Sequence, residues 1–192
     1  MKNLTESVSA ATSELSELES RRESAIACSR RIIRQTKVVI HGIHTGSDVT
    51  GEMERLNGQM SDMLDLCRDP LILCSGPVQD AMGEYAEAVI LNAVMSGDSI
   101  PGHDELRIPA SAWILGLADC EGELRRVVMT RLMDGDLEGA RDVFSELESI
   151  HEQVMLLDVP DAVAPVRRKQ DIARGIMDKT RSDMTTASIM HR

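Results

Sequence analysis

Four acidic residues stand in two pairs, each within an otherwise apolar stretch of the sequence. Asp119 and Glu123 are four residues apart, and Glu84 and Glu87 are three apart. Residues at these spacings share one face of an α-helix, so each pair projects from a single face. Ionised carboxylates are costly to desolvate unless a cation or a hydrogen-bond donor meets them. The two pairs therefore predict one carboxylate cluster shared between two helices.

Such a cluster suits a hard divalent cation. Mg²⁺ and Mn²⁺ prefer oxygen ligands, and carboxylates supply them. A bound ion of this kind polarises a phosphoryl oxygen and produces a water nucleophile near neutral pH. Phosphodiester hydrolysis is therefore a natural chemistry for the cluster, with nearby arginines orienting the phosphate through paired hydrogen bonds.

Two alternatives compete with a magnesium site. The first is a structural ion-pair network between the acids and four arginines, Arg30, Arg34, Arg125 and Arg126. Spacing alone favours that network, because site predictions from sequence are often wrong. The second is a di-iron bundle, which requires Glu-x-x-His on two helices. The residues three positions after Glu84 and Glu123 are not histidines, so the di-iron alternative is weak.

The charge of the chain is unevenly distributed. The net charge of −11 argues at first against a nucleic-acid partner. However, six of the 21 Lys and Arg residues lie in residues 21–37 and six more in residues 167–181, with only three acids in both windows. An acidic body with two basic helical stretches favours an enclosed anion site over a uniformly repulsive surface.

The first basic window contains a stripe that could follow a phosphate backbone. Arg30, Arg34 and Lys37 lie along one helical face, although a solvated face is the default interpretation of such a stripe. Aromatic residues make up only 2% of the chain, so platforms for base stacking are scarce. Any RNA binding should therefore be electrostatic, tolerant of sequence and sensitive to salt.

The rest of the sequence predicts a single all-α domain over residues 1–192, with frayed ends at 1–10 and 187–192. The scarcity of aromatic residues and the helical spacing of Leu, Ile, Val and Met favour helices over strands. One interruption is expected near Ser75–Pro77. Helices are expected at 3–41, from Ser47 or Asp48 to before Pro70, at 71–96, from Pro109 to 134, at 137–157 and at 163–186.

The cysteines and the lack of a long apolar run predict a cytoplasmic protein with reduced thiols and no membrane span. The four cysteines form no CxxC pair and no metal-ligand spacing, so we expect small hydrophobic fillers. No signal peptide and no run of about 18 apolar residues is expected. Glu121 lies on the side of its helix opposite Asp119 and is expected to face solvent or a neighbouring subunit, and His151 is expected at the surface.

Two segments resemble the best motifs of the translin family. They are Gln79–Ala88, QDAMGEYAEA, and Leu115–Arg126, LGLADCEGELRR. Ser29–Arg34, Gly135–Asp136 and Arg167–Arg174 also fit the family, so the resemblance covers nearly the whole chain in order. It implies an all-α subunit of six or seven helices that assembles into closed, hollow octamers and binds single-stranded nucleic acid.

The family has two branches, and the acids resemble those of the catalytic one. Translin proper binds RNA and DNA and lacks the full acid set. Translin-associated factor X, or Trax, carries that set and is a Mg²⁺-dependent endoribonuclease acting inside the shell. Matched residue by residue, its catalytic acids correspond to Glu84, Glu87, Asp119 and Glu123. The resemblance therefore favours metal binding over a structural network, in a prokaryotic, archaeal-type member that forms a homo-oligomer.

The resulting hypothesis is a metal-dependent endoribonuclease that cleaves single-stranded RNA inside an oligomeric shell. The four acids would be both the catalytic residues and the ligands of Mg²⁺ or Mn²⁺. The candidate nucleic-acid contacts, which the family motifs do not fix, are Arg30, Arg34, Lys37, Arg125 and Arg126. A non-catalytic protein that binds single-stranded RNA or DNA, as translin does, and a purely structural helical assembly remain the alternatives.

Overall fold

The computed structural model describes residues 3–190, which form seven helices and no strand. The predicted all-α fold is confirmed. None of these helices combines the length and the apolar character needed to cross a membrane. Their bounds are α1 Leu4–His44, α2 Thr50–Leu66, α3 Pro70–Leu73, α4 Gly76–Ser96, α5 Ala110–Met133, α6 Leu137–Met155 and α7 Val166–Met190.

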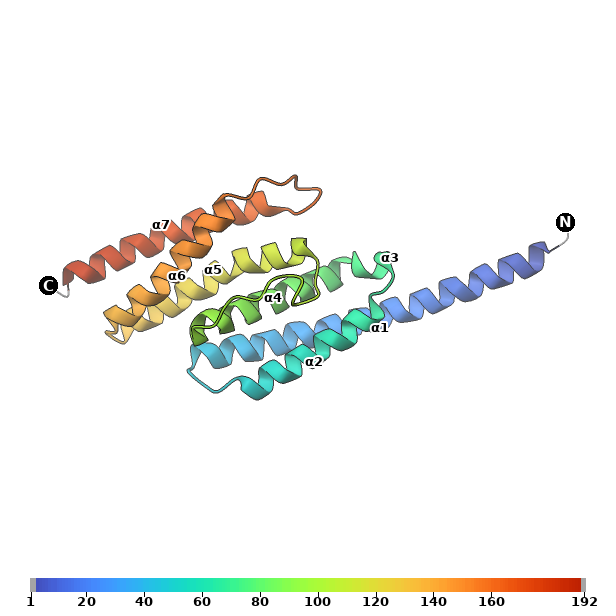
Figure 1. Ribbon diagram of the computed structural model, residues 1–192, viewed down its shortest axis with the longest axis horizontal. Helices are drawn as coiled ribbons and strands as arrows, with labels where there is room; N and C mark the ends of the chain where they lie inside the picture. The colour runs from blue at the N-terminus through green and yellow to red at the C-terminus, as the bar shows by residue number, and fades with distance from the viewer. Residues whose placement is uncertain (1–2, 191–192) are drawn as a thin grey trace.

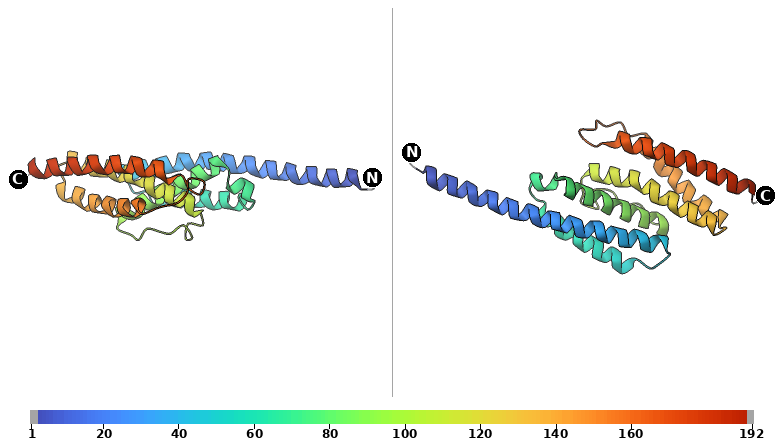
Figure 2. Two further views of the ribbon diagram at one scale, coloured as in Figure 1. Left: turned by 90° about the horizontal axis from the view of Figure 1, so that it is seen from above. Right: turned by 180° about the vertical axis from the view of Figure 1, so that it is seen from behind.

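The long helices lie side by side, in an order that differs from their order in the chain. Figure 1 shows α2, α1, α4 and α5 following one another across the molecule, with α6 and α7 beyond α5. The views in Figure 2 agree with this arrangement. Helix α4 packs between α1 and α5, and α5 also contacts α6 and α7. The two helices with the acid pairs are therefore neighbours at the centre of the bundle.

The helix predicted over 71–96 is interrupted where the sequence suggested. Helix α3 begins at Pro70, and the side chain of Asp69 accepts a hydrogen bond of 2.8 Å from the Leu71 amide. It ends after one turn, and α4 starts with Pro77 in its first turn. A proline is tolerated there because the first amides of a helix have no intrahelical acceptor.

Both ends of the described chain are helical. Residues 4–10 and 187–190, for which the sequence suggests fraying, belong to α1 and α7. Residues 1–2 and 191–192, which share that expectation, lie outside the described residues. All four cysteines are free thiols, as expected, and three of them are buried. Cys74 is exposed, so it does not fill the core.

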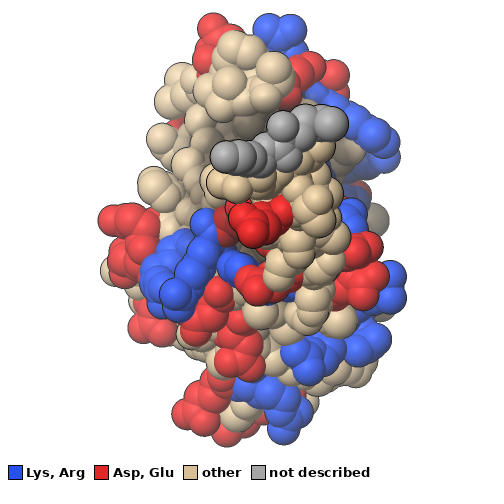
Figure 3. Space-filling view, turned by 90° about the vertical axis from the view of Figure 1, so that its right-hand side faces the viewer, with Lys and Arg blue, Asp and Glu red and all other residues tan. Residues whose placement is uncertain are grey.

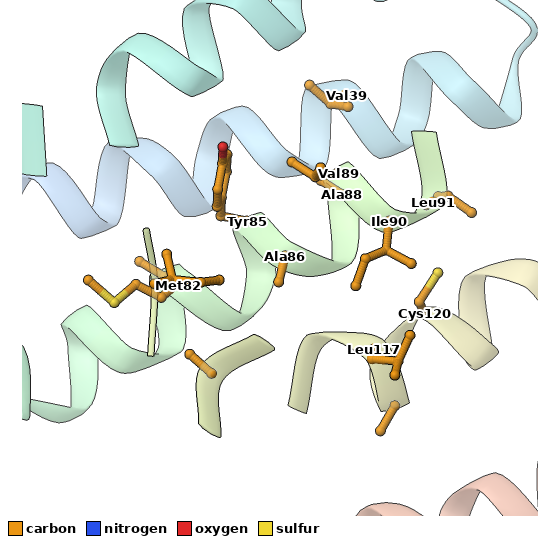
Figure 4. Packing of buried hydrophobic residues seen from close by; sticks show 14 of the residues in the cluster. Val39, Met82, Tyr85, Ala86, Ala88, Val89, Ile90, Leu91, Leu117 and Cys120 are labelled. Carbon is orange, nitrogen blue, oxygen red and sulfur yellow. The ribbon is translucent and has the colours of Figure 1, made fainter. Parts of the chain in front are cut away.

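The core is aliphatic, and α4 runs through it. Ten of its 21 residues are buried, which makes α4 apolar on most of its circumference. Figure 4 shows Ile90 of α4 near Leu117 and Cys120 of α5, with Ala86 and Met82 farther along α4. Glu84 and Glu87 thus occupy the small polar part of a mostly buried helix.

Two glycines allow α4 and α5 to approach closely. A Cβ atom added to Gly116 would lie 2.5 Å from the Gly83 carbonyl oxygen and 2.9 Å from the Glu87 amide nitrogen. It would also lie 2.7 Å from the Cβ atom of Ala86. Real Cβ atoms do not occupy such positions, so this crossing requires glycine at 116. Glu87 and Asp119 each lie within one helical turn of the crossing.

The crossing leads to a prediction about Gly116. We expect Gly116→Ala to lower the free energy of unfolding by about 1–3 kcal/mol, because the new methyl group overlaps the backbone of α4. Urea denaturation followed by circular dichroism measures the change. Gly122→Ala in the same helix is the matched control, since its Cβ would meet only Ile176 at 3.9 Å. The control should be neutral or stabilising, and equal losses in the two variants would contradict the role of the crossing.

Candidate metal centre

The structure brings the four predicted acids together between α4 and α5. Glu84 and Glu87 lie on α4, Asp119 and Glu123 lie on α5, and all four are partly buried. Asp119 acts electrostatically on both glutamates of α4, and Glu87 is also influenced by Glu84 and Glu123. The two acid pairs therefore lie within electrostatic range of one another.

The proton affinities of the two glutamates on α4 reflect this crowding. Burial, followed by repulsion from Asp119, Glu84 and Glu123, raises the pKa of Glu87 to about 8. Burial and then the charge of Asp119 also raise the pKa of Glu84, against a smaller opposing effect of Lys37. Additional positive charge at this place would relieve the repulsion.

A lysine and a histidine contact the acids of α5. The Lys169 ammonium of α7 lies 2.5 and 2.6 Å from the two carboxylate oxygens of Asp119. The His44 Nε2 atom, at the end of α1, contacts Glu123 Oε2. Arg126 lies farther from Glu123, with its Nη1 atom 3.8 Å from Oε2. The pairs are thus made mainly by a lysine and a histidine, and not by the arginines of the predicted structural network.

The acids of α4 have no such partner. Among the described residues, no ion pair involves Glu84 or Glu87. Nor do three Asp, Glu, His or Cys side chains in residues 3–190 stand close enough together to coordinate one metal ion. The donors fit a hard dication by their charge and oxygen chemistry, because all four are carboxylates and the two on α4 have no ion-pair partner among the described residues. Binding an ion would require Asp119 to exchange its contact with Lys169.

Sequence reasoning missed Lys169 and His44 as members of this site. Lys169 lies within Arg167–Arg174, a segment that resembles the family pattern. The resemblance marked this segment, but the sequence did not show that Lys169 contacts Asp119. From its place at the end of α1, the sequence alone offered no buried partner for His44. Its imidazole is instead only 5% exposed and contacts an acid 79 residues away. Both contacts depend on how distant helices pack.

Three of the five predicted nucleic-acid residues lie on α1. Arg30 and Arg34 are exposed on α1 and line a groove that also contains Asp62 and Asp65 of α2. Lys37, on the same helix, is near enough to Glu84 to oppose the rise of its pKa. The stripe on α1 therefore leads from a groove of mixed charge toward the carboxylates.

Arg125 and Arg126 behave differently from each other. Arg125 joins α5 to α7, since its Nη1 donates to Thr180 Oγ1 at 2.9 Å and its Nη2 to Asp183 at 2.8 Å. Its guanidinium is therefore used within the subunit. Arg126 is 59% exposed. On the face seen in Figure 3, Lys and Arg side chains alternate with acidic ones and form no single basic patch.

The predictions for Glu121 and His151 are wrong. Glu121 is fully buried, and His151 is only 12% exposed. The His151 Nδ1 atom lies 2.8 Å from Glu121 Oε2. The opposite side of α5 faces α6 within the same chain, so a residue turned away from the acid cluster enters a second helix interface.

Comparisons with known proteins agree with this fold. No model of a known protein family matches the chain. The chain is 33% identical over 176 residues to an uncharacterized protein of Methanocaldococcus jannaschii, covering 90% of this chain and 78% of that protein.

Three solved structures share the fold over nearly the whole length. The structure of apo-NeC3PO has a TM-score of 0.81 at 21% identity, covering 94% of this chain and 96% of that one. The structure of AfC3PO has a TM-score of 0.79 at 28% identity. The complex of AfC3PO with duplex RNA has a TM-score of 0.76 at 27% identity. Both AfC3PO comparisons cover 95% of this chain and 97% of the other.

The fold is therefore the all-α fold of the C3PO structures. The chain belongs to the translin family, as an archaeal-type member.

The raised pKa of Glu87 leads to a prediction about pH. The folded pKa of about 8 lies above the ordinary value of 4.5, so between these values the folded state holds a proton that the unfolded state has lost. The free energy of unfolding should therefore fall as pH rises from about 4.5 to 8. In the presence of EDTA, Glu87→Gln should be more stable than the parent above pH 8 by roughly 1–3 kcal/mol, after allowance for solvent screening.

Urea denaturation at pH 5, 6.5 and 8 measures this effect. Glu146→Gln on the exposed face of α6 is the matched control and should follow the parent at every pH. A Glu87→Gln variant that loses as much stability between pH 5 and 8 as the parent would show that Glu87 is ionised at little cost.

Proposed function

We propose that this protein is an oligomeric RNA-binding protein that cleaves single-stranded RNA by metal-dependent phosphodiester hydrolysis. The main supporting observation is the set of four carboxylates from α4 and α5, two of which have no ion-pair partner among the described residues. The similarity to AfC3PO, which has been solved with duplex RNA, supports RNA as the partner.

The acids of the cluster would hold Mg²⁺ or Mn²⁺, which when bound activates a phosphoryl group and a water molecule. The ligands would be Glu84, Glu87, Asp119 and Glu123. The pKa of Glu87 is about 8 without an ion, so binding of the dication near neutral pH would release the proton of this carboxyl group. The Lys169 ammonium, once released from Asp119, would lie beside the cluster and could pair with a phosphate oxygen.

The basic stripe on α1 would bring the RNA to the acids. Arg30 and Arg34 are exposed, and Lys37 lies near Glu84, so a phosphate backbone following the three residues would end beside the cluster. Arg126 is a further candidate contact, whereas Arg125 is held by α7. Contacts of this kind do not read bases, so single-stranded DNA should also bind.

Assembly would reconcile an acidic chain with an anionic ligand. In a closed shell, such as the homo-octamer implied by the family resemblance, the basic stripe would face inward and much of the excess negative charge outward. The cytoplasmic location expected from the reduced cysteines remains a prediction.

A second candidate function is RNA binding without cleavage. The observation that favours it is the contact of Lys169 with both oxygens of Asp119, together with the lack of three converging ligands among residues 3–190. If the lysine held Asp119 too tightly for a dication to displace it, the protein would be a non-catalytic container for nucleic acid.

Asp119→Asn separates the two functions. The substitution keeps the shape of the side chain but removes the charge that both Lys169 and a dication would use. Cleavage of a labelled single-stranded RNA in Mg²⁺ should fall at least about 100-fold, while RNA binding survives. Asp142→Asn, on the exposed face of α6, is the matched control and should cleave normally.

EDTA should abolish cleavage by the parent protein. Normal cleavage by Asp119→Asn, or cleavage that persists in EDTA, would reject the metal-dependent mechanism. Tight RNA binding by the parent protein without any cleavage in Mg²⁺ or Mn²⁺ would favour the second candidate function, RNA binding without cleavage.

The stripe on α1 leads to a separate prediction. Arg30→Ala combined with Arg34→Ala should lower the slope of log affinity against log salt by about 1–2, since each phosphate contact releases counterions. Filter binding of single-stranded RNA over a range of salt concentrations measures this slope. Arg55→Ala on α2 is the control for the loss of an exposed arginine. An unchanged slope in the double variant would place the RNA elsewhere on the protein.

A further inference from the structure

The first half of α1 extends away from the bundle. Figures 1 and 2 show this helix projecting beyond the body of the molecule. Of residues 4–24, only Leu18 is even partly buried. Leu4, Val8 and Leu15 are 55%, 56% and 65% exposed. About half of a 41-residue helix therefore has almost no contact with its own chain.

The exposed apolar residues continue a stripe that is buried in the second half of the same helix. Alternating steps of four and three residues connect Leu4, Val8, Ala11, Leu15 and Leu18. Through position 22 the same steps lead to five residues of the core, Ala25, Ser29, Ile32, Thr36 and Val39, each of which is fully buried. A heptad stripe of this kind is the surface with which a helix packs against another helix.

The sequence of this half is poorly suited to an isolated helix in water. Eight of residues 5–24 are Ser or Thr, which are weaker helix formers than Ala, Leu or Glu. The N-cap residue, Asn3, makes no side-chain hydrogen bond to the first turn. Single helices of this length are only marginally stable in water without tertiary packing. We therefore expect the apolar stripe to pack against another helix.

The charges of the segment exclude two kinds of partner and favour a third. Residues 4–20 contain four glutamates and neither Lys nor Arg, so RNA and anionic membrane surfaces would be repelled. Arg21 and Arg22 follow directly at the base of the segment. When two copies of the segment lie antiparallel, the acidic residues of one copy face the arginines of the other.

We propose that residues 11–22 pair antiparallel with the same segment of a second copy of this chain. In this register Leu15 packs against the partner's Leu18, and Leu18 against the partner's Leu15. Ala11 faces the partner's Arg22, where the small side chain leaves space for the aliphatic stem of the arginine. The contact is two-fold symmetric, so each interaction occurs twice.

The flanking charges select this orientation. In the antiparallel pair, Glu14 faces the partner's Arg21, again twice. In a parallel pair, Glu14 would instead face the partner's Glu19, which is repulsive. The pairing specifies one contact of the proposed oligomer and depends on neither metal binding nor RNA cleavage.

The first test is Leu15→Glu in the full chain. The variant places two charges in the centre of the proposed contact, so size-exclusion chromatography with light scattering should show a smaller assembly than the parent forms. Leu15 is 65% exposed within its own chain, so the subunit should keep its fold by near-ultraviolet circular dichroism. Ser13→Glu, on the opposite face of the helix, adds the same charge and should assemble as the parent does.

The second test reverses the flanking charges. Glu14→Arg and Arg21→Glu should each raise the dissociation constant of the assembly by about tenfold, and the double variant should restore it. A monomeric parent, or a Leu15→Glu variant with unchanged mass, would overturn the pairing. A double variant no better than the single ones would also overturn it. None of these readouts involves RNA or metal, so they leave the nuclease proposal to its own test.

Discussion

The direct contact between the backbones of α4 and α5 determines where the other functional parts lie. Gly116 sits against the Gly83 carbonyl oxygen and the Glu87 amide, at a distance that no larger residue permits. Helices usually keep their axes apart by the width of their side chains. At this crossing the two backbones touch. Glu87 and Asp119, each within one turn of the crossing, are therefore partly buried and repel each other. The apolar core around α4 stabilises this arrangement despite the repulsion.

The partners of the acids on α5 come from helices on either side of the α4–α5 pair. His44 reaches Glu123 from the end of α1, and Lys169 reaches Asp119 from α7. A dication would compete with the Lys169 ammonium for the same two oxygens, and one link between α5 and α7 would then be lost. Arg125 provides a second link through Thr180 and Asp183, so α7 would remain attached. The exchange of one cation for another is therefore compatible with the fold.

The apolar stripe of α1 is buried in the second half of the helix and exposed in the first half. The second half packs between α2 and α4, and its exposed face carries the basic stripe toward Glu84. The first half has the same apolar stripe, but no helix of its own chain covers it. The buried residues of α1 lie from Ala25 onward, and of its first half only Leu18 packs against the core. Pairing between copies would link assembly to the helix that also carries the candidate RNA contacts.

The amino-acid sequence was enough to predict the all-α fold, the helix bounds to within a few residues and the two helices that carry the acids. These features are local: apolar spacing, prolines and glycines act within one or two turns, and Glu84 with Glu87 or Asp119 with Glu123 share a face by helix geometry alone. Which residues meet across helices follows from the packing of the folded chain. Lys169 approaches Asp119 across 50 residues of chain, and Glu121 is buried against His151 across 30, contrary to expectation. No spacing rule spans such separations, because they depend on the order in which the helices pack and on a crossing close enough to require Gly116.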